Sequence, residues 1–200
     1  MTKPWKNSRF CERRTMTVSD ILRETAALGF NEVPDNLSLF YGALSRAVVT
    51  VDRLRPTVRT YTVEQKAGGA EGVYRGYADY DIAALVPDFL TFASPVSSES
   101  DFRVREGHIL SLPLSFTGKA TVLYRPVLPS YAEGDEDKKI PLPDDLCRLL
   151  PLLCAASLCF EADPERASFW LQSYFTEAKA LERLRSPISR SGVTVVDGWC

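Results

Sequence analysis

The chain has 200 residues, of which 45% are hydrophobic and 25% charged, and its formal net charge is -2. This composition fits one globular unit with a sizeable core and excludes disorder along the whole chain. Apolar runs fall short of the about 18 residues of a membrane span, and none follows the basic N-terminus, so we expect no membrane segment, no secretory signal and synthesis in the cytosol.

Residues 1–16 form a basic N-terminal arm. Its cations face a single acid, Glu12, and alternate with the aromatic residues Trp5 and Phe10. Such a composition suits contact with phosphates or with an acidic protein surface, although an unstructured terminus would read the same way. The candidates for an acidic-surface or DNA contact are Lys3, Lys6, Arg9, Arg13 and Arg14.

Two helices are predicted within residues 17–56. The first begins at Thr17, where a hydroxyl cap is followed by Asp20 in the first turn, and it ends at Gly29. In the second, apolar residues recur at three- and four-residue spacing from Leu37 until Pro56 stops the pattern.

Residues 57–130 change to the alternating period of strands. The glycine-rich stretch 66–72 predicts a hairpin between strands at 58–64 and 73–77. Further strands are expected at 102–105 and 108–116, joined through Glu106-Gly107, and at 119–128, while 81–95 reads as a loop over one end of the sheet. We expect a small antiparallel β subdomain of about four to six strands.

Two more helices are predicted beyond a solvated acidic loop at 132–139. One opens at Pro143-Asp144-Asp145, is apolar on most sides and should kink at Pro151. The other opens at Asp163-Pro164-Glu165 and reaches about Arg185. Its apolar stripe consists of Ala167, Trp170, Leu171, Tyr174, Ala178, Leu181 and Leu184.

The fold class that follows is α+β. Two N-terminal and two C-terminal helices, from residues 17–56 and 140–185, form a helical bundle with the β subdomain of 57–130 inserted. Residues 186–200 form a C-terminal tail, whose β-branched run is costly to leave in water, so we expect it to dock on a partner. The candidate docking residues are Val193, Val195, Val196 and Trp199.

Motifs for chemistry are sparse in the sequence. The five cysteines lack paired spacing, and three of them fall in an apolar helix pattern, where a reduced cysteine acts as a small hydrophobe. His108 stands alone in a turn, and the glycine-rich stretch 68–72 lacks the Lys-Ser/Thr of a phosphate loop. We therefore expect no catalytic residue, no metal and no cofactor. A small hydrolase using Asp79, Asp81 or His108 stays open as an alternative.

Three segments resemble the neck proteins of tailed bacteriophages: the glycine turn and strand of Ser115 to Pro126, the acidic entry and buried helix of Ile140 to Ala156, and the acidic break and helix of Phe160 to Glu177. The resemblance implies a non-enzymatic head-to-tail connector, or adaptor, in the neck of the virion. Such proteins form a homo-oligomeric ring of about twelve subunits between the portal protein and the tail or neck proteins. DNA would pass through the channel without sequence-specific binding. Another neck or tail-completion protein, or a nucleic-acid-binding module using the basic arm, is the alternative.

Overall fold

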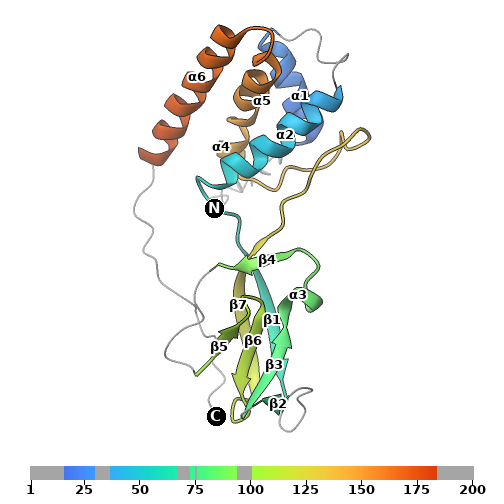
Figure 1. Cartoon of the computed structure of the whole chain (residues 1–200), viewed down its shortest axis with the longest axis vertical. Coiled ribbons are helices and arrows are strands. Elements are labelled where there is room, and N and C mark those ends of the chain that lie inside the picture. Colours follow the sequence, from blue (N-terminus) through green and yellow to red (C-terminus); the bar gives the residue numbers. More distant parts are fainter. Residues whose placement is uncertain (1–15, 30–36, 67–72, 75, 94–100, 184–200) are drawn as a thin grey trace, which may run out of the picture. The chain divides into compact units, whose positions relative to one another are not determined.

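The computed structural model describes residues 16–29, 37–66, 73–74, 76–93 and 101–183 (Figure 1). They form helices and two small antiparallel sheets, which confirms a mixed helix and strand class. The chain divides into two compact units, a helical unit from the residues up to Val51 together with Ser130–Leu181, and a strand unit that begins at Asp52 and runs to Pro129. Each unit buries its own set of apolar side chains.

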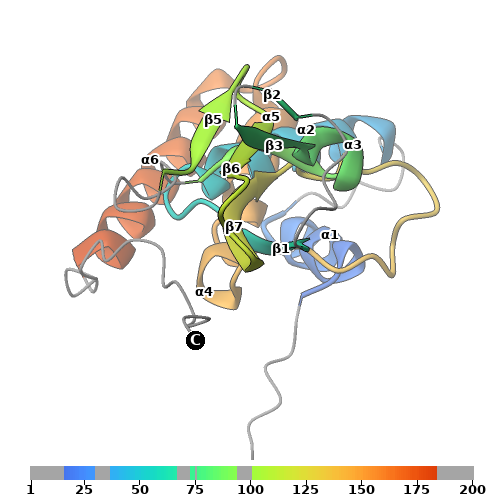
Figure 2. The ribbon, with the colours of Figure 1, turned by 90° about the horizontal axis from the view of Figure 1, so that it is seen from below.

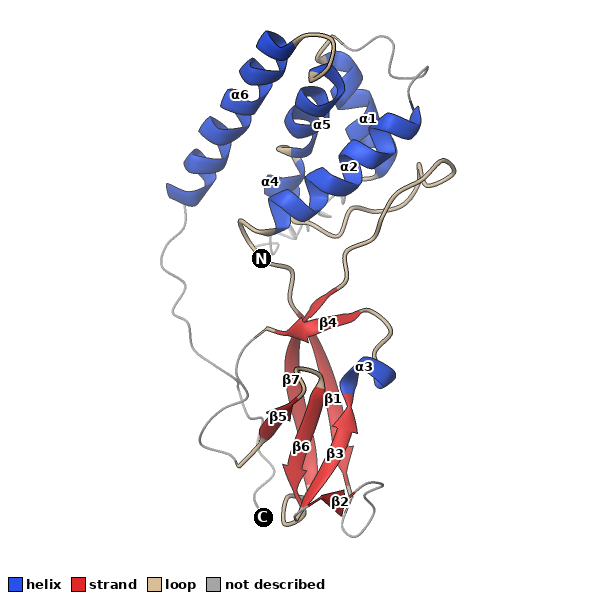
Figure 3. Ribbon diagram, in the orientation of Figure 1, coloured by secondary structure: helices blue, strands red, loops and turns tan. Residues whose placement is uncertain are grey.

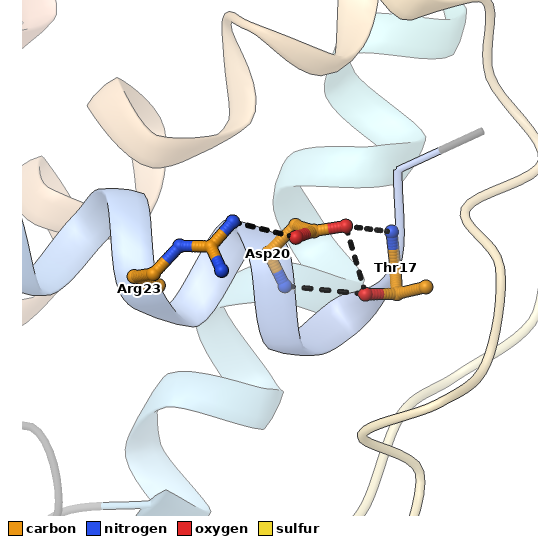
Figure 4. Close-up of polar contacts among 3 residues, drawn as sticks. All are labelled: Thr17, Asp20 and Arg23. Carbon is orange, nitrogen blue, oxygen red and sulfur yellow. Dashed lines mark hydrogen bonds and ion pairs between the residues drawn. The ribbon is translucent and has the colours of Figure 1, made fainter. Parts of the chain in front are cut away.

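Helix α1, Val18–Ala27, begins as predicted with a capping box (Figure 4). The backbone N–H of Asp20 donates to the Thr17 hydroxyl at 3.2 Å, and the Thr17 N–H donates to the Asp20 carboxylate at 3.1 Å. Arg23 adds an ion pair to the same carboxylate at 2.7 Å. The cap satisfies N–H groups that a helix start leaves without intrahelical partners.

Helix α2, Leu37–Asp52, confirms the second predicted helix. Its buried face repeats at helical spacing through Phe40, Leu44, Val48 and Val51. The chain then turns toward the strand unit, where the Thr57 N–H and hydroxyl both donate to Asp52 Oδ1.

The third predicted helix is in fact two, α4 at Asp144–Cys147 and α5 at Leu150–Cys159. Pro151 stands in the first turn of α5 and not at a kink inside one helix. A proline is tolerated there because the first N–H groups of a helix have no intrahelical acceptor. Most of α5 is buried, and α1 packs against it.

Helix α6, Pro164–Arg183, starts where the sequence predicted it. The Arg166 N–H donates to the Asp163 carboxylate at 3.0 Å, which is the expected cap. The predicted stripe faces inward, with Ala167, Tyr174 and Ala178 buried. Leu184 lies outside the described residues.

The acidic loop predicted at 132–139 belongs to the helical unit and is mostly exposed, as expected, but it is also bonded to the helices. The N–H groups of Val18 and Ser19 donate to the carbonyls of Lys138 and Glu136, at 3.0 and 2.9 Å. The Glu136 carboxylate accepts a hydrogen bond from the Tyr41 hydroxyl. Backbone pairing to the start of α1 and one buried tyrosine therefore hold this segment against the helices.

The strand unit contains two antiparallel sheets, ordered β1-β7-β4 and β2-β3-β6-β5. Figure 2 shows β7 beside β1 and β6 beside β3, as the pairing requires. The strands are β1 Arg59–Gln65, β2 Val73–Tyr74, β3 Tyr77–Asp81, β4 Phe89–Phe92, β5 Arg103–Arg105, β6 Ile109–Pro113 and β7 Gly118–Pro126, and the short helix α3, Ile82–Leu85, lies among them (Figure 3).

Three expectations for this unit are wrong. The segment 58–64 does not pair with 73–77, because β1 pairs with β7 and β2 pairs with β3. The expected loop at 81–95 contains α3 and also β4, which pairs with β7. The described residues hold seven strands in place of four to six. The hairpin through Glu106-Gly107 is confirmed, and both residues adopt the positive φ of a tight turn.

One apolar core joins the two sheets. Val63 of β1 and Val122 of β7 pack in the same cluster as Leu110 and Leu112 of β6. The inward residues alternate along β1 and β7, as expected for strands with one face on a core.

Candidate functional site

A polar cluster lies on the outer face of the four-stranded sheet. Asp79 of β3 stands opposite Ser111 of β6, and the Ser111 hydroxyl donates a hydrogen bond to Asp79 Oδ1 at 2.6 Å. Arg105 of β5 donates to the other carboxylate oxygen at 2.8 Å. Beside them, the Arg103 guanidinium lies 4.4 Å from the centre of the Tyr77 ring. The cluster ties together β3, β5 and β6 across the sheet.

The chemistry of Ser111 is limited by its surroundings. Its side chain is only 1% exposed, so no substrate reaches the hydroxyl in this conformation. A serine nucleophile needs a base that takes its proton, whereas the Asp79 carboxylate is engaged by a guanidinium. The observed role of Asp79 is therefore to connect β3 with β5 and β6 through its hydrogen bonds.

The other two residues of the hydrolase alternative have local partners. Asp81 accepts the Ala84 N–H at 3.1 Å and so caps α3. His108 Nδ1 lies 2.9 Å from the Glu106 carbonyl oxygen, inside its own turn. Asp79, Asp81 and His108 thus have contacts that serve the strands and turns around them.

Asp88 is the centre of a second cluster, whose other members the sequence did not indicate. The Tyr124 hydroxyl donates to Asp88 Oδ1 at 3.0 Å, and Arg59 forms an ion pair with Oδ2. The Val127 N–H donates to the Asp88 carbonyl at 2.7 Å. Burial, together with the bond to Asp88, raises the pKa of Tyr124. Asp88 therefore fastens the start of β1 and the end of β7 to the turn before β4.

The cysteines of the helical unit are buried thiols, as the sequence predicted. Burial raises the pKa of Cys147 and of Cys154 to about 12, so both stay protonated and unreactive near neutral pH. Within the described residues, no group of three or more His, Cys, Asp and Glu side chains could hold a metal ion.

Large apolar side chains stand exposed on the helical unit. Phe160 follows α5 and is 66% exposed, while Phe169 and Phe175 of α6 are 58% and 57% exposed. Phe169 contacts Trp170 edge to face, with ring centroids 4.9 Å apart. Three exposed phenylalanines within one helix and its approach are unusual for a surface that meets only water.

The predicted docking and contact residues lie outside the described residues. These are Val193, Val195, Val196 and Trp199 of the tail, and Lys3, Lys6, Arg9, Arg13 and Arg14 of the arm. The described chain stops at Arg183, the end of α6.

Comparison with protein-family models and with curated proteins finds no match for this chain. Among the described helices, none is long and apolar enough to cross a membrane.

Proposed function

We propose that this chain is a structural protein of a tailed-phage virion, a head-to-tail adaptor that forms a homo-oligomeric ring between the portal protein and the tail. In this proposal, helices from both ends of the chain form a bundle into which the strand unit is inserted. The protein acts by assembly and not by catalysis, and DNA passes through its ring. Another neck or tail-completion role is the nearest alternative.

The segments that carry the phage resemblance correspond to elements of the structure. Ser115 to Pro126 covers the turn before β7 and β7 itself. Ile140 to Ala156 contains α4 and most of α5, and Phe160 to Glu177 contains most of α6. The resemblance therefore covers β7 and α4 in full and most of α5 and α6, so it draws on both units.

The exposed phenylalanines of the helical unit are the observation that supports an assembly role most directly. Phe160, Phe169 and Phe175 expose aromatic rings while the face of α6 around Ala167 and Tyr174 is already packed. Removing an aromatic side chain from water is favourable in free energy, so exposed rings indicate a surface that contacts a partner. In a ring, each subunit meets its neighbour through two different surfaces.

The test is the mass and shape of the purified chain, measured by light scattering after size exclusion and by negative-stain microscopy. The chain is examined alone and with the portal protein of the same phage. Rings, formed alone or only with portal and lost when residues 186–200 are deleted, are expected. A chain that stays monomeric and does not bind the portal protein would overturn the adaptor proposal.

A matched pair of variants tests the two exposed phenylalanines of α6. The double variant Phe169→Ser, Phe175→Ser should reduce ring formation, while Gln172→Ser, an exposed change on the same helix, should leave it intact. Because both rings are mostly in water, the unfolding midpoint should change little in either variant. Equal ring formation in all three proteins would remove these phenylalanines from the interface.

A further inference from the structure

Strand β1 lies at the edge of its sheet and has no second strand partner among the described residues. The two sheets have four edge strands in the described chain, and three of them are short: β2 has two residues, β5 has three and β4 has four. Strand β4 is also interrupted by a register shift. Strand β1 has seven residues and pairs with β7 in unbroken register. Short or bulged edges discourage the addition of another strand, whereas a long regular edge invites it.

The side chains of β1 alternate in a way that suits strand addition. Val63 and Gln65 are buried and Tyr61 packs against the core, while Thr60, Thr62 and Glu64 are exposed. Thr62 already makes a cross-strand contact with Thr121 of β7, with the two hydroxyl oxygens 3.0 Å apart. An added strand that places apolar residues inward and threonine outward would extend both faces.

We propose that β1 accepts residues Val193–Asp197 from the tail of a neighbouring copy as an antiparallel strand. The inference rests on the proposed ring, because it names the contact that links one subunit to the next. Donor tail and acceptor edge are different surfaces, so the contact is heterologous and each subunit both gives and receives a strand.

The length and composition of the tail fit this role. Seventeen residues, 184–200, follow Arg183, the end of α6. The first nine can span up to about 30 Å when extended, which leaves Val193 to Val196 free to pair at a distance. These four consecutive residues are all β-branched, the side-chain type that strands favour.

One register matches the two segments. It places Asp197 opposite Arg59 and Thr194 opposite Thr62, so a charge pair forms at one end and a threonine row continues from β7 through β1. The inward positions Tyr61 and Val63 then meet Val195 and Val193 on the core side. A shift of one residue would exchange the two faces of the tail, and a two-residue shift would separate Asp197 from Arg59.

Engineered cysteines test this register. In a Cys11→Ser, Cys200→Ser background, a chain carrying Thr62→Cys is mixed with a chain carrying Thr194→Cys under mild oxidation. Directly opposed strand residues lie within the Cα separation that a disulfide allows. We expect a two-chain cross-link several-fold more abundant than that from the mismatched pair Thr60→Cys and Thr194→Cys.

A tail variant tests the contact without engineered cysteines. Val195→Pro removes a backbone donor and should lower the assembled fraction several-fold, whereas Ser189→Pro in the spacer should not. Both positions follow α6 in the chain, and we expect the unfolding midpoint of either variant to equal that of the parent.

The outcomes separate the two proposals. Rings that form without the matched cross-link would overturn the strand contact and leave the adaptor role standing. A cross-link that forms only inside one chain carrying both cysteines would show that the tail returns to its own β1, which overturns the neighbouring-copy assignment. A two-chain cross-link in a protein that never forms rings would support the strand contact and overturn the ring.

Discussion

The Tyr41 hydroxyl donates a 2.5 Å hydrogen bond to Glu136 Oε1, joining residues 95 positions apart in the chain. Tyr41 belongs to α2, and Glu136 belongs to the segment that returns from the strand unit. The ring of Tyr41 is buried, so the bond lies at the edge of the helical core. It fixes the acidic segment against a helix that the chain left before it entered the strand unit.

Substitutions at Tyr41 should separate the ring from the hydroxyl. Tyr41→Ala removes a buried ring and should lower the free energy of unfolding of the helical unit by about 3 to 5 kcal/mol. Tyr41→Phe keeps the ring and loses only the bond to Glu136. Its unfolding free energy should therefore fall by only a minor part of the decrease expected for Tyr41→Ala. Urea titration of both variants measures the difference, and equal losses would mean that the ring contributes little.

The same pair makes the helical unit sensitive to pH. The Tyr41 bond, followed by backbone N–H groups, holds the pKa of Glu136 below its ordinary value of 4.5. A lowered carboxyl pKa gives stability that is present above the ordinary value and is lost as the pH falls through the folded pKa. Burial, followed by the bond to Glu136, raises the pKa of Tyr41 from 10.0 to about 12. That contribution is present below pH 10 and disappears as the pH rises toward 12.

Urea midpoints of the parent and Tyr41→Phe, measured from pH 7 down to 3, check the acid side of this expectation. The gap between the two proteins should be widest near neutrality and should narrow below pH 4.5. A gap that stays constant over this range would show that the Glu136 charge does not contribute through Tyr41.

Gln65 should be essential to the strand unit. It is 4% exposed, and its Nε2 donates to the carbonyls of Pro113 and Phe116 at 2.8 and 2.9 Å. Gln65→Leu keeps the approximate shape but removes both of these bonds. The Pro113 carbonyl keeps the Phe116 N–H as a donor, whereas the Phe116 carbonyl loses its Gln65 donor, so the change should cost about 1 to 3 kcal/mol of unfolding free energy. The adjacent, exposed change Glu64→Gln should stay within about 0.5 kcal/mol. Similar unfolding midpoints for the two variants would contradict this role.

Two glycine-to-alanine changes should act in opposite directions. Gly29 has a φ of +97°, and a Cβ there would stand 2.6 Å from Arg166 Nη2, so Gly29→Ala should destabilise by about 1 to 2 kcal/mol. Gly42 lies inside α2, where a Cβ would meet Arg46 Nη1 at an ordinary 3.7 Å. Gly42→Ala should therefore stabilise by about 0.5 to 1 kcal/mol. Thermal melts of the two variants give the signs directly, and a stabilising Gly29→Ala would show that Arg166 moves aside at no cost.

For the candidate sites, the sequence pointed to single residues but not to the partners that they contact. The sequence singled out Asp79 as a possible acid, but its partners Arg105 and Ser111 are 26 and 32 positions away and become neighbours only through the order β3-β6-β5. The partners of Asp88 carried no sequence signal, because Arg59 begins β1 and Tyr124 lies near the end of β7, far from Asp88 in the chain. The predicted arm and tail residues lie outside the described chain, so their roles stay predictions.

The sequence by itself determined the helices α1, α2 and α6 and the places where they begin. Caps such as Thr17 with Asp20, and Asp163 before Pro164, act within three residues, and the apolar stripes of α2 and α6 repeat within single helices. Tertiary structure alone decided the strand partners. Strand β1 does not pair with β2, the next strand along the chain, but with β7. Thr62 therefore contacts Thr121, 59 positions away. The alternation of apolar and polar residues along a strand shows which of its faces is buried. Which strand pairs with it depends on the core that the two sheets share.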